Sequence, residues 1–382
     1  MAKDFSPSPP PLTPPLTEEV KLDWLRLLRS RRVGPTTFHR LLSEHGSAAA
    51  ALAALPDIAH AAGVAKYQPC TLQAAEDELL SGARAGARLV ACTEADYPPL
   101  LRELPDAPPL LWAMGDLSLL ARPMVAMVGA RSASSLGIRM ARKLAAELSG
   151  SGFVVVSGLA RGIDTEAHKA ALQGGTIAVM AGGVDVVYPA QNTVLAQEIS
   201  ETGLRLAEQP MHMTPQARHF PMRNRIISGL CRAVIVVEAA AKSGSLITAR
   251  NALDQGRDVL AVPGHPFDAR AAGCNMLIRD GATLARSAAD VAEALADPPG
   301  APAGVAGPAP TLPPERPARD PAEIHRLHTQ ILGQLGPSPL AEDQLIRDLG
   351  QPAGEVAPEI LTLELEGRIA RDAGGLLSRI DA

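Results

Sequence analysis

Six short apolar runs between residues 124 and 262 constrain the fold of this 382-residue chain more than any other feature. Because these runs are almost continuously aliphatic, they predict strands that are buried on both faces. Segments with helical periodicity, such as 138–148 and 165–172, lie between most of them. The runs are 124–128, 153–157, 176–181, 204–208, 233–238 and 258–262. This alternation predicts right-handed βαβ units and an extended, Rossmann-like, doubly wound parallel sheet of the α/β class.

The N-terminal region has a different pattern, which predicts a helical module over residues 18–96. Leucines at 22, 25 and 28 recur at helical spacing, and Phe38, Leu41 and Leu42 repeat it after a Gly-Pro break at 33–37. Such a module is typical of SAM-like or helix-hairpin-helix domains, and it either packs on the next domain or contacts DNA. Residues 97–296 are assigned to the Rossmann-like domain, with 97–116 expected to be a proline-punctuated connector.

The C-terminal region begins with residues 297–320, which are mostly Pro, Ala and Gly and therefore predict a linker. Residues 321–382 have the element order of a winged helix. The candidate recognition helix, 354–366, contains four glutamates and no Lys or Arg, so a phosphate groove would repel it. We therefore expect this domain to contact a protein partner rather than DNA.

Charge is distributed unevenly along the chain, whose overall net charge is −5. Residues 121–290 hold 18 Lys and Arg against 13 Asp and Glu, whereas 321–382 hold 5 against 10. A basic middle and an acidic end suggest separate partners. The four cysteines form no CxxC pair, and no apolar run is long enough to span a membrane, so a soluble cytoplasmic protein is expected.

Candidate site residues follow the predicted strands, where parallel sheets bind ligands. Small residues at these turns let backbone N–H groups approach an anion, and arginine adds a fork-shaped donor for phosphate. Because βα turns need glycine in any case, a purely structural role for the glycines remains open. The candidates are Gly129, Arg131, Ser132, Gly158, Arg161, Lys242, Ser243, Gly244 and Ser245.

A second group of candidates lies in the segment 218–225. Arg218, Arg223, Asn224 and Arg225 surround Phe220 in a chain that is only 3% aromatic. An aromatic ring among cations is the usual means of binding single-stranded nucleic acid, with bases stacked on the ring. The structural alternative is a loop of solvated arginines that leads into a helix.

No cofactor, metal or catalytic group is predicted. The first turn, GARSAS, is not GxGxxG, and the chain has no GxxxxGK[ST] motif. The histidines and methionines at 211–213 and 219 lack a carboxylate or cysteine at ligand spacing. Asp164 and His168, four residues apart on a helix, favour a local structural role over catalysis.

The motifs GARSAS, SGLARGIDTEAHKAAL, GGVDVVYP, FPMRNRIISGL, KSGSLITAR and GCNMLIRDGA occur in this order. Together they closely resemble the DNA-processing protein A (DprA, or Smf) family across residues 97–295. The resemblance implies a dimeric, non-enzymatic protein that binds and protects incoming single-stranded DNA during natural transformation and loads the RecA recombinase.

Carried over by position, the resemblance assigns DNA binding to Arg131, base stacking to Phe220, and the family's RNR and KSGS motifs to 223–225 and 242–245. A lysine of some members is replaced here by Ala217, beside Arg218. Two other functions stay open at this point. A nucleotide phosphoribohydrolase would share the sheet, but Arg250 stands where its acid is needed. A scaffold that contacts only proteins would not explain Arg131.

Overall fold

The computed structural model describes residues 17–61, 66–296, 321–335, 340–352, 356, 359–360, 363, 368–371 and 376–379. They fall into two compact units, within residues 1–297 and 298–382, and each unit is described by itself. The linker predicted at 297–320 lies outside the described residues. Among the described residues, no helix has both the length and the apolar character needed to cross a membrane.

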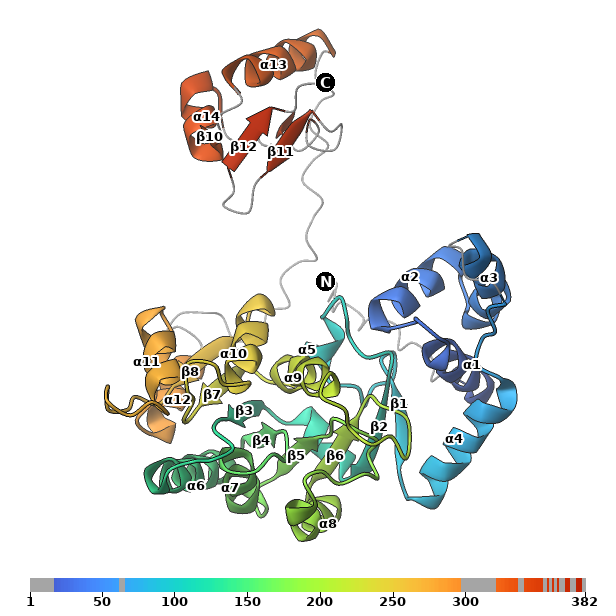
Figure 1. Cartoon of the computed structure of the whole chain (residues 1–382), viewed down its shortest axis with the longest axis vertical. Helices are drawn as coiled ribbons and strands as arrows, with labels where there is room; N and C mark the ends of the chain where they lie inside the picture. Colours follow the sequence, from blue (N-terminus) through green and yellow to red (C-terminus); the bar gives the residue numbers. More distant parts are fainter. Residues whose placement is uncertain are drawn as a thin grey trace, which may run out of the picture. The chain divides into compact units, whose positions relative to one another are not determined.

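A nine-stranded sheet forms the centre of the first unit (Figure 1). Strands β3 to β9 are all parallel to one another, whereas β2 pairs antiparallel with β6 and β1 pairs antiparallel with β2. In spatial order the strands are β1 (Arg88–Ala91), β2 (Leu110–Gly115), β6 (Leu204–Ala207), β5 (Thr176–Val179), β4 (Val154–Ser157), β3 (Met124–Val128), β7 (Ala233–Val236), β8 (Asp258–Ala261) and β9 (Thr283–Leu284). The Rossmann-like, doubly wound prediction is confirmed.

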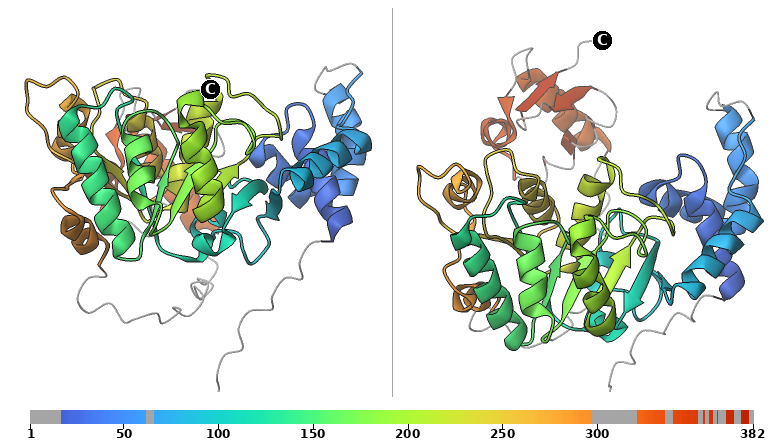
Figure 2. Two further views of the ribbon diagram at one scale, coloured as in Figure 1. Left: turned by 90° about the horizontal axis from the view of Figure 1, so that it is seen from below. Right: turned by 60° about the horizontal axis from the view of Figure 1, so that its bottom comes forward.

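Helices cover both faces of this sheet (Figures 1 and 2). On one face lie α6 (Ser135–Gly150), α7 (Ile163–Ala171) and α12 (Ala288–Leu295), and on the other lie α9 (His219–Leu230) and α10 (Ser245–Asp254). In β3, Val125 and Met127 pack with α6 and α7, while Ala126 and Val128 pack with α9 and α10. The strands are mostly apolar because most of their residues are buried on both faces, although β6 contains the buried Arg205.

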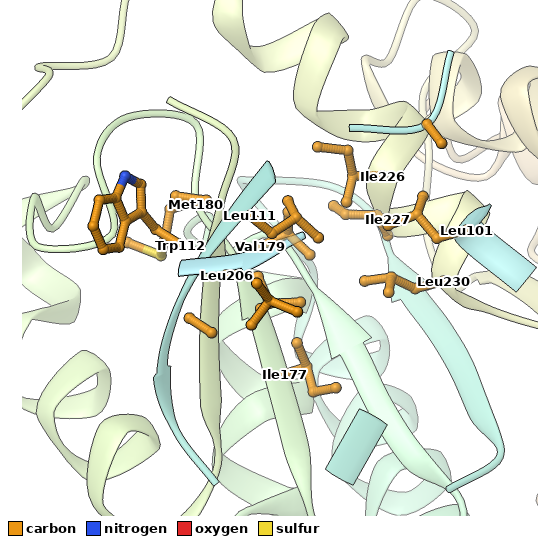
Figure 3. Close-up of a cluster of buried hydrophobic side chains, with 14 of the residues drawn as sticks. Leu101, Leu111, Trp112, Ile177, Val179, Met180, Leu206, Ile226, Ile227 and Leu230 are labelled. Atoms are coloured by element: carbon orange, nitrogen blue, oxygen red, sulfur yellow. The ribbon is translucent and has the colours of Figure 1, made fainter. Parts of the chain in front are cut away.

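The region 88–115 differs from its prediction. Residues 88–91, assigned to the helical module, form β1, and the expected connector contains α5 (Pro99–Arg102) and the buried strand β2. The last proline of the connector is Pro109, so the following residues are free to pair with β6 through backbone hydrogen bonds. Figure 3 shows Leu111 of β2 in a buried cluster with Leu206 of β6 and Ile226 and Leu230 of α9.

The N-terminal module consists of α1 (Glu18–Arg29), α2 (Pro35–His45), α3 (Ala48–Ala61) and α4 (Leu72–Arg84). Gly34 caps α2 and proline occupies its first turn, as the predicted break requires. The module is joined to the sheet by buried polar contacts. Arg29 forms a 2.8 Å ion pair with Glu78, whose carboxylate also accepts a 2.8 Å hydrogen bond from Trp112 Nε1 of β2. Of the two expected roles, packing on the next domain is therefore observed.

The second unit contains α13 (Pro321–Gln334), β10 (Leu340–Ala341), α14 (Glu342–Leu349), β11 (Ile369–Arg371) and β12 (Leu376–Arg379), with strand order β10-β12-β11. Within the predicted helix 354–366, the described residues Val356, Ile360 and Leu363 are buried in the unit's core. Glu359 accepts a 2.7 Å hydrogen bond from His328 of α13. The winged-helix prediction is confirmed.

The packing between α4 and β2 generates a stability prediction. A Cβ atom at Gly82 would lie 2.2 Å from the Trp112 ring, which is fully enclosed. Gly82→Ala, normally favourable in a helix by about 1 kcal/mol, should therefore destabilise the first unit by about 1–3 kcal/mol. Urea unfolding followed by tryptophan fluorescence measures this, because both tryptophans of the chain lie in this unit. Gly150→Ala, where a Cβ meets nothing within 4 Å, is the control. Equal unfolding midpoints for the two variants would contradict the packing argument.

Candidate nucleic-acid interface

Two adjoining hollows lie where the parallel strands end. The larger, here called the groove, has a volume of about 590 Å³ and is lined by the turns after β3 and β7 and by α9. The smaller, here called the side pocket, has a volume of about 380 Å³ and is lined by the turn after β4 and by 188–191. Arg131, Ala160 and Phe220 line both hollows. Residues from six separate parts of the sequence thus share one surface.

An aromatic and cationic cluster separates the groove from the side pocket. The Arg131 guanidinium carbon lies 5.3 Å from the centre of the Phe220 ring, within cation–π range. On the side-pocket side, the Tyr188 ring lies 5.7 Å from Phe220 at an angle of 58°. Tyr188 is half exposed. The cluster therefore offers planar apolar surface and a positive charge at the same place.

Three of the predicted cations are exposed to solvent at this surface. Arg131 and Lys242 line the groove, and Arg161 lines the side pocket. Within the described part of the chain, none of these three side chains forms an ion pair. Their charges are therefore available to an anionic ligand.

Arg223 is placed differently, because its side chain is buried. Its guanidinium donates hydrogen bonds to the carbonyl oxygens of Gly158, at 2.8 Å, and Val179. Burial lowers the pKa of Arg223, and the neighbouring Asp164 carboxylate opposes this shift. Arg223 lines the groove, but its guanidinium is used to join α9 to the ends of β4 and β5, so the phosphate contact expected of Arg223 stays a prediction.

Arg225 also has partners within the fold. It forms a 2.6 Å ion pair with Glu208 and donates a 2.8 Å hydrogen bond to the carbonyl oxygen of Asp106. This second arginine of the motif is not among the residues that line the groove, and it holds α9 to the neighbouring segments. Its expected phosphate contact likewise stays a prediction.

The remaining polar candidates divide by position. Asn224 and Ser132 line the groove, together with the turn 242–245. In that turn, Ser243 Oγ and Ser245 Oγ are 2.7 Å apart, and Gly244 caps α10 with nothing within 4 Å of a Cβ. Arg218 is exposed at the start of α9 but lines neither hollow. The segment 219–225, for which a loop was the structural alternative, is helical.

Two candidate glycines are explained by close packing. A Cβ atom at Gly158 would lie 2.6 Å from the Arg223 guanidinium, and one at Gly129 would lie 2.6 Å from Ile163. Larger residues would push apart the turns after β3 and β4. The structural explanation that the sequence left open for these glycines is therefore sufficient, although both border the hollows.

Asp164 organises the turn that carries Arg161. Its Oδ2 accepts hydrogen bonds from the backbone N–H groups of Gly158 and Ala160, at 3.1 and 3.4 Å. On the other side of the turn, Asn192 Nδ2 donates to the Leu159 carbonyl at 2.9 Å. Burial raises the pKa of the Asp164 carboxyl, against the opposing effect of Arg223. The acid thus has a structural task, as its position on the helix predicted.

His168 supports the same turn in its neutral form. Thr176 Oγ1 donates to the Val155 carbonyl, so the 2.7 Å contact between Thr176 Oγ1 and His168 Nδ1 requires the proton to be on Nδ1. Nε2 is then free to accept the 3.3 Å hydrogen bond from the Leu159 N–H group. Complete burial, followed by the nearby Arg223, lowers the pKa of His168 to about 3.

Comparison with known proteins identifies the family. Residues 88–296 match the model described as DNA recombination-mediator protein A, which is more than half of the chain. Residues 18–80 match the DprA-like N-terminal HHH domain, and residues 313–375 match the DprA winged helix domain. The chain belongs to the DprA family.

Individual relatives agree with this assignment. DNA processing protein DprA of Streptococcus pneumoniae is 50% identical over 197 residues, covering 51% of this chain and 70% of that protein. Protein Smf of Synechocystis is 38% identical over 314 residues, covering 74% and 77%. The X-ray structure of the S. pneumoniae protein superposes with a TM-score of 0.61 at 38% identity, covering 71% of this chain and 97% of that one.

A further solved structure is that of DNA processing protein A from Helicobacter pylori, described for its single-stranded DNA binding mode. It superposes with a TM-score of 0.51 at 31% identity and covers 55% of this chain and 95% of that one. These relatives place the chain among DprA-family proteins of DNA processing and recombination.

Sequence reasoning did not select two residues of this surface. Tyr188 follows a predicted strand, but nothing in its sequence position indicates that its ring packs beside Phe220. Arg270 lines the groove although it lies 28 residues beyond Lys242 in the sequence numbering. The available signal for Tyr188 was its place in the motif GGVDVVYP, in the segment that follows a predicted strand.

The buried histidine generates a pH prediction. Because the pKa of His168 is far below 6.5 in the fold, the unfolded chain takes up the proton first. The contribution of the neutral His168 to the free energy of unfolding is complete above about pH 6.5. As the pH falls from there toward the folded pKa of about 3, this contribution should decrease by up to about 1.4 kcal/mol per pH unit. His168→Gln should have a lower unfolding free energy at pH 7 and a flatter dependence between about pH 6 and 4.

The measurement is urea unfolding at a series of pH values, with exposed His60→Gln as the control. Asp164 is present in all three proteins, so its titration does not distinguish them. If the curves of His168→Gln and the wild type run parallel, His168 is not held neutral by the turn.

Proposed function

We propose that this chain binds single-stranded DNA without strong sequence preference, as a non-catalytic recombination mediator. In this proposal it acts in the cytoplasm as a homodimer, protects the strand, and promotes RecA loading during natural transformation. The observation that carries the proposal is the cluster of Arg131, Phe220 and Tyr188 between two open hollows.

The chemistry of the cluster favours single strands. A base can reach the Phe220 ring only when it is unpaired, since stacking requires a free π-face. Stacking accepts all four bases, and Arg131, Arg161 and Lys242 supply charge to the phosphates without reading sequence. Binding of this kind is weakly sequence-dependent and strongly salt-dependent.

The family supports the mediator role. The matched model is described as a recombination mediator, and the H. pylori relative is described for single-stranded DNA binding. A dimer would place two such grooves on one strand and raise the apparent affinity through effective concentration. RecA is the partner that the family resemblance implies for the strand once it is bound.

A non-catalytic role is consistent with the groove's acidic residue. The carboxylate of Asp164 lines the groove, but it is buried and accepts backbone hydrogen bonds. A nucleotide phosphoribohydrolase would need an acid positioned for N-glycosidic cleavage, and Arg250 occupies the corresponding position in the sequence. This arrangement favours DNA binding over the hydrolase alternative.

Two substitutions test the site. Arg131→Ala and Phe220→Ala should each weaken binding of labelled oligo-dT, measured by fluorescence anisotropy, and duplex of the same length should bind weakly to the wild type. For Phe220→Ala the expected loss is about 1–3 kcal/mol, roughly 5- to 150-fold, because one stacking surface is removed. For Arg131→Ala the slope of log affinity against log salt should fall by about 0.7.

Lys143→Ala is the control for charge, since Lys143 is an exposed cation of α6 that pairs with Glu147 and lines neither hollow. RecA filament formation on the same strand, in the presence of a single-strand-binding protein, gives a second measurement that should fall in parallel. Equal affinity for single strand and duplex, or groove variants that bind like Lys143→Ala, would refute the proposed function.

The C-terminal domain should contribute little to the affinity for DNA. Residues 321–382 carry 10 acids against 5 bases, so phosphate does not attract them. We propose that this domain binds a protein partner instead. Deleting these residues should leave the affinity for oligo-dT within about twofold of the wild type, measured by the same titration. A tenfold loss would place a DNA contact in this domain.

A further inference from the structure

Phe267 is the most exposed large hydrophobic residue among those described, with 95% of its surface accessible. It lies in the loop 263–271 between β8 and α11 (Ala272–Arg279). The chain has only five phenylalanines, and the other three described ones are buried or partly buried. A single exposed ring is common on protein surfaces and does not by itself indicate a function. Here the structure of the loop and the neighbouring residues indicate one.

The loop holds Phe267 outward in a fixed geometry. At its start, Gly264 exchanges two hydrogen bonds with the Asn275 side chain, at 3.1 and 2.9 Å. Beyond the ring, Asp268 accepts two hydrogen bonds from the Arg270 guanidinium, at 3.0 and 3.1 Å. The His265 ring lies 5.5 Å from the Phe267 ring, and the two planes are inclined by 37°. Two neighbouring rings are thus ordered without being buried.

The same loop borders the groove. Arg270 lines the groove together with Lys242 and Arg131. The Gly273 N–H group donates a 2.8 Å hydrogen bond to the Ala239 carbonyl, which fixes the end of the loop against the turn that carries Lys242. Because β8 is parallel to β7, the loop lies at the carboxyl edge of the sheet, where the other site turns gather (Figure 2).

Charge also favours an anionic strand over an apolar partner at this place. Lys242 is exposed and unpaired among the described residues, and it lies on the groove wall next to the loop. The nearby carboxylates of Asp268 and Glu238 are both paired with Arg270, at 3.0 and 3.9 Å. The negative charges near the two rings are therefore neutralised by Arg270, and Lys242 beside them remains available to a phosphate.

We propose that Phe267, with His265, forms a second base-stacking platform for the single strand that occupies the groove. This inference rests on the proposed function. The strand stacks one base on Phe220, passes its phosphates along Arg131 and Lys242, and stacks a base beyond the groove on Phe267. The platform accepts any base, since a phenyl ring makes no base-specific hydrogen bond.

The test uses two lengths of labelled oligo-dT on the full chain. A strand of about four nucleotides is at the lower end of known site sizes and should fill the groove alone, whereas one of about sixteen should also reach the platform. Phe267→Ala should bind the short strand like the wild type and the long strand at least about fivefold more weakly. Phe267→Trp should restore binding, and its fluorescence should be quenched by the long strand only.

Leu253→Ala removes an exposed apolar side chain of α10 that does not line the groove, and it is the matched control. Phe220→Ala separates the two proposals because it should weaken binding of both lengths. If Phe220→Ala weakens binding but Phe267→Ala binds both lengths like the wild type, the platform is refuted while the proposed function stands. Light scattering measures whether Phe267→Ala also changes the oligomeric state. If the loss of affinity is fully explained by dissociation of an oligomer, Phe267 contacts another protein chain rather than DNA, and the platform is likewise refuted.

Discussion

At the carboxyl edge of the sheet, the buried guanidinium of Arg223 joins three elements that are distant in sequence. It comes from α9 and donates to the carbonyl oxygens of Gly158 and Val179, at the ends of β4 and β5, beside the Asp164 carboxylate. An unpaired buried charge costs several kcal/mol, so these partners are a condition of the fold. Phe220 lies on the first turn of the same helix, and its position against Arg131 and Tyr188 depends on this connection.

The arginines of the molecule therefore divide into two groups by environment. Arg223 and Arg225 are held by carbonyl and carboxylate partners and fix the scaffold. Arg131 and Arg161 lie at the surface of the hollows, where a phosphate can replace water at little cost. The residue type is the same in both groups, but the positions differ. Arg223 and Arg225 lie on α9 and reach partners within the fold, whereas Arg131 and Arg161 lie on the turns after β3 and β4 and are exposed.

The fold was largely predictable because its strands are buried on both faces. The prediction for β3 agrees with its observed bounds, and the other five predicted strands agree to within two residues at each end. β1 and β2 were missed for a physical reason. They lie at the edge of a parallel sheet, and their assignment depends on the antiparallel pairing of β1 with β2 and of β2 with β6 rather than on local pattern. The hydrogen bond from Trp112 to Glu78 then joins β2 to α4, 34 residues earlier in the chain.

The sequence by itself determined the α/β class, the order of the turns at the sheet edge, and the family resemblance, because these follow from local periodicity and from motifs that are contiguous in the chain. It also indicated Arg131 and Phe220. The tertiary structure decided which cations are exposed, that Tyr188 joins Phe220, and that Phe267 is presented beside the groove. Burial and mutual distance are properties of packed elements, and residues such as Arg223 and Arg131 cannot be distinguished until those elements meet.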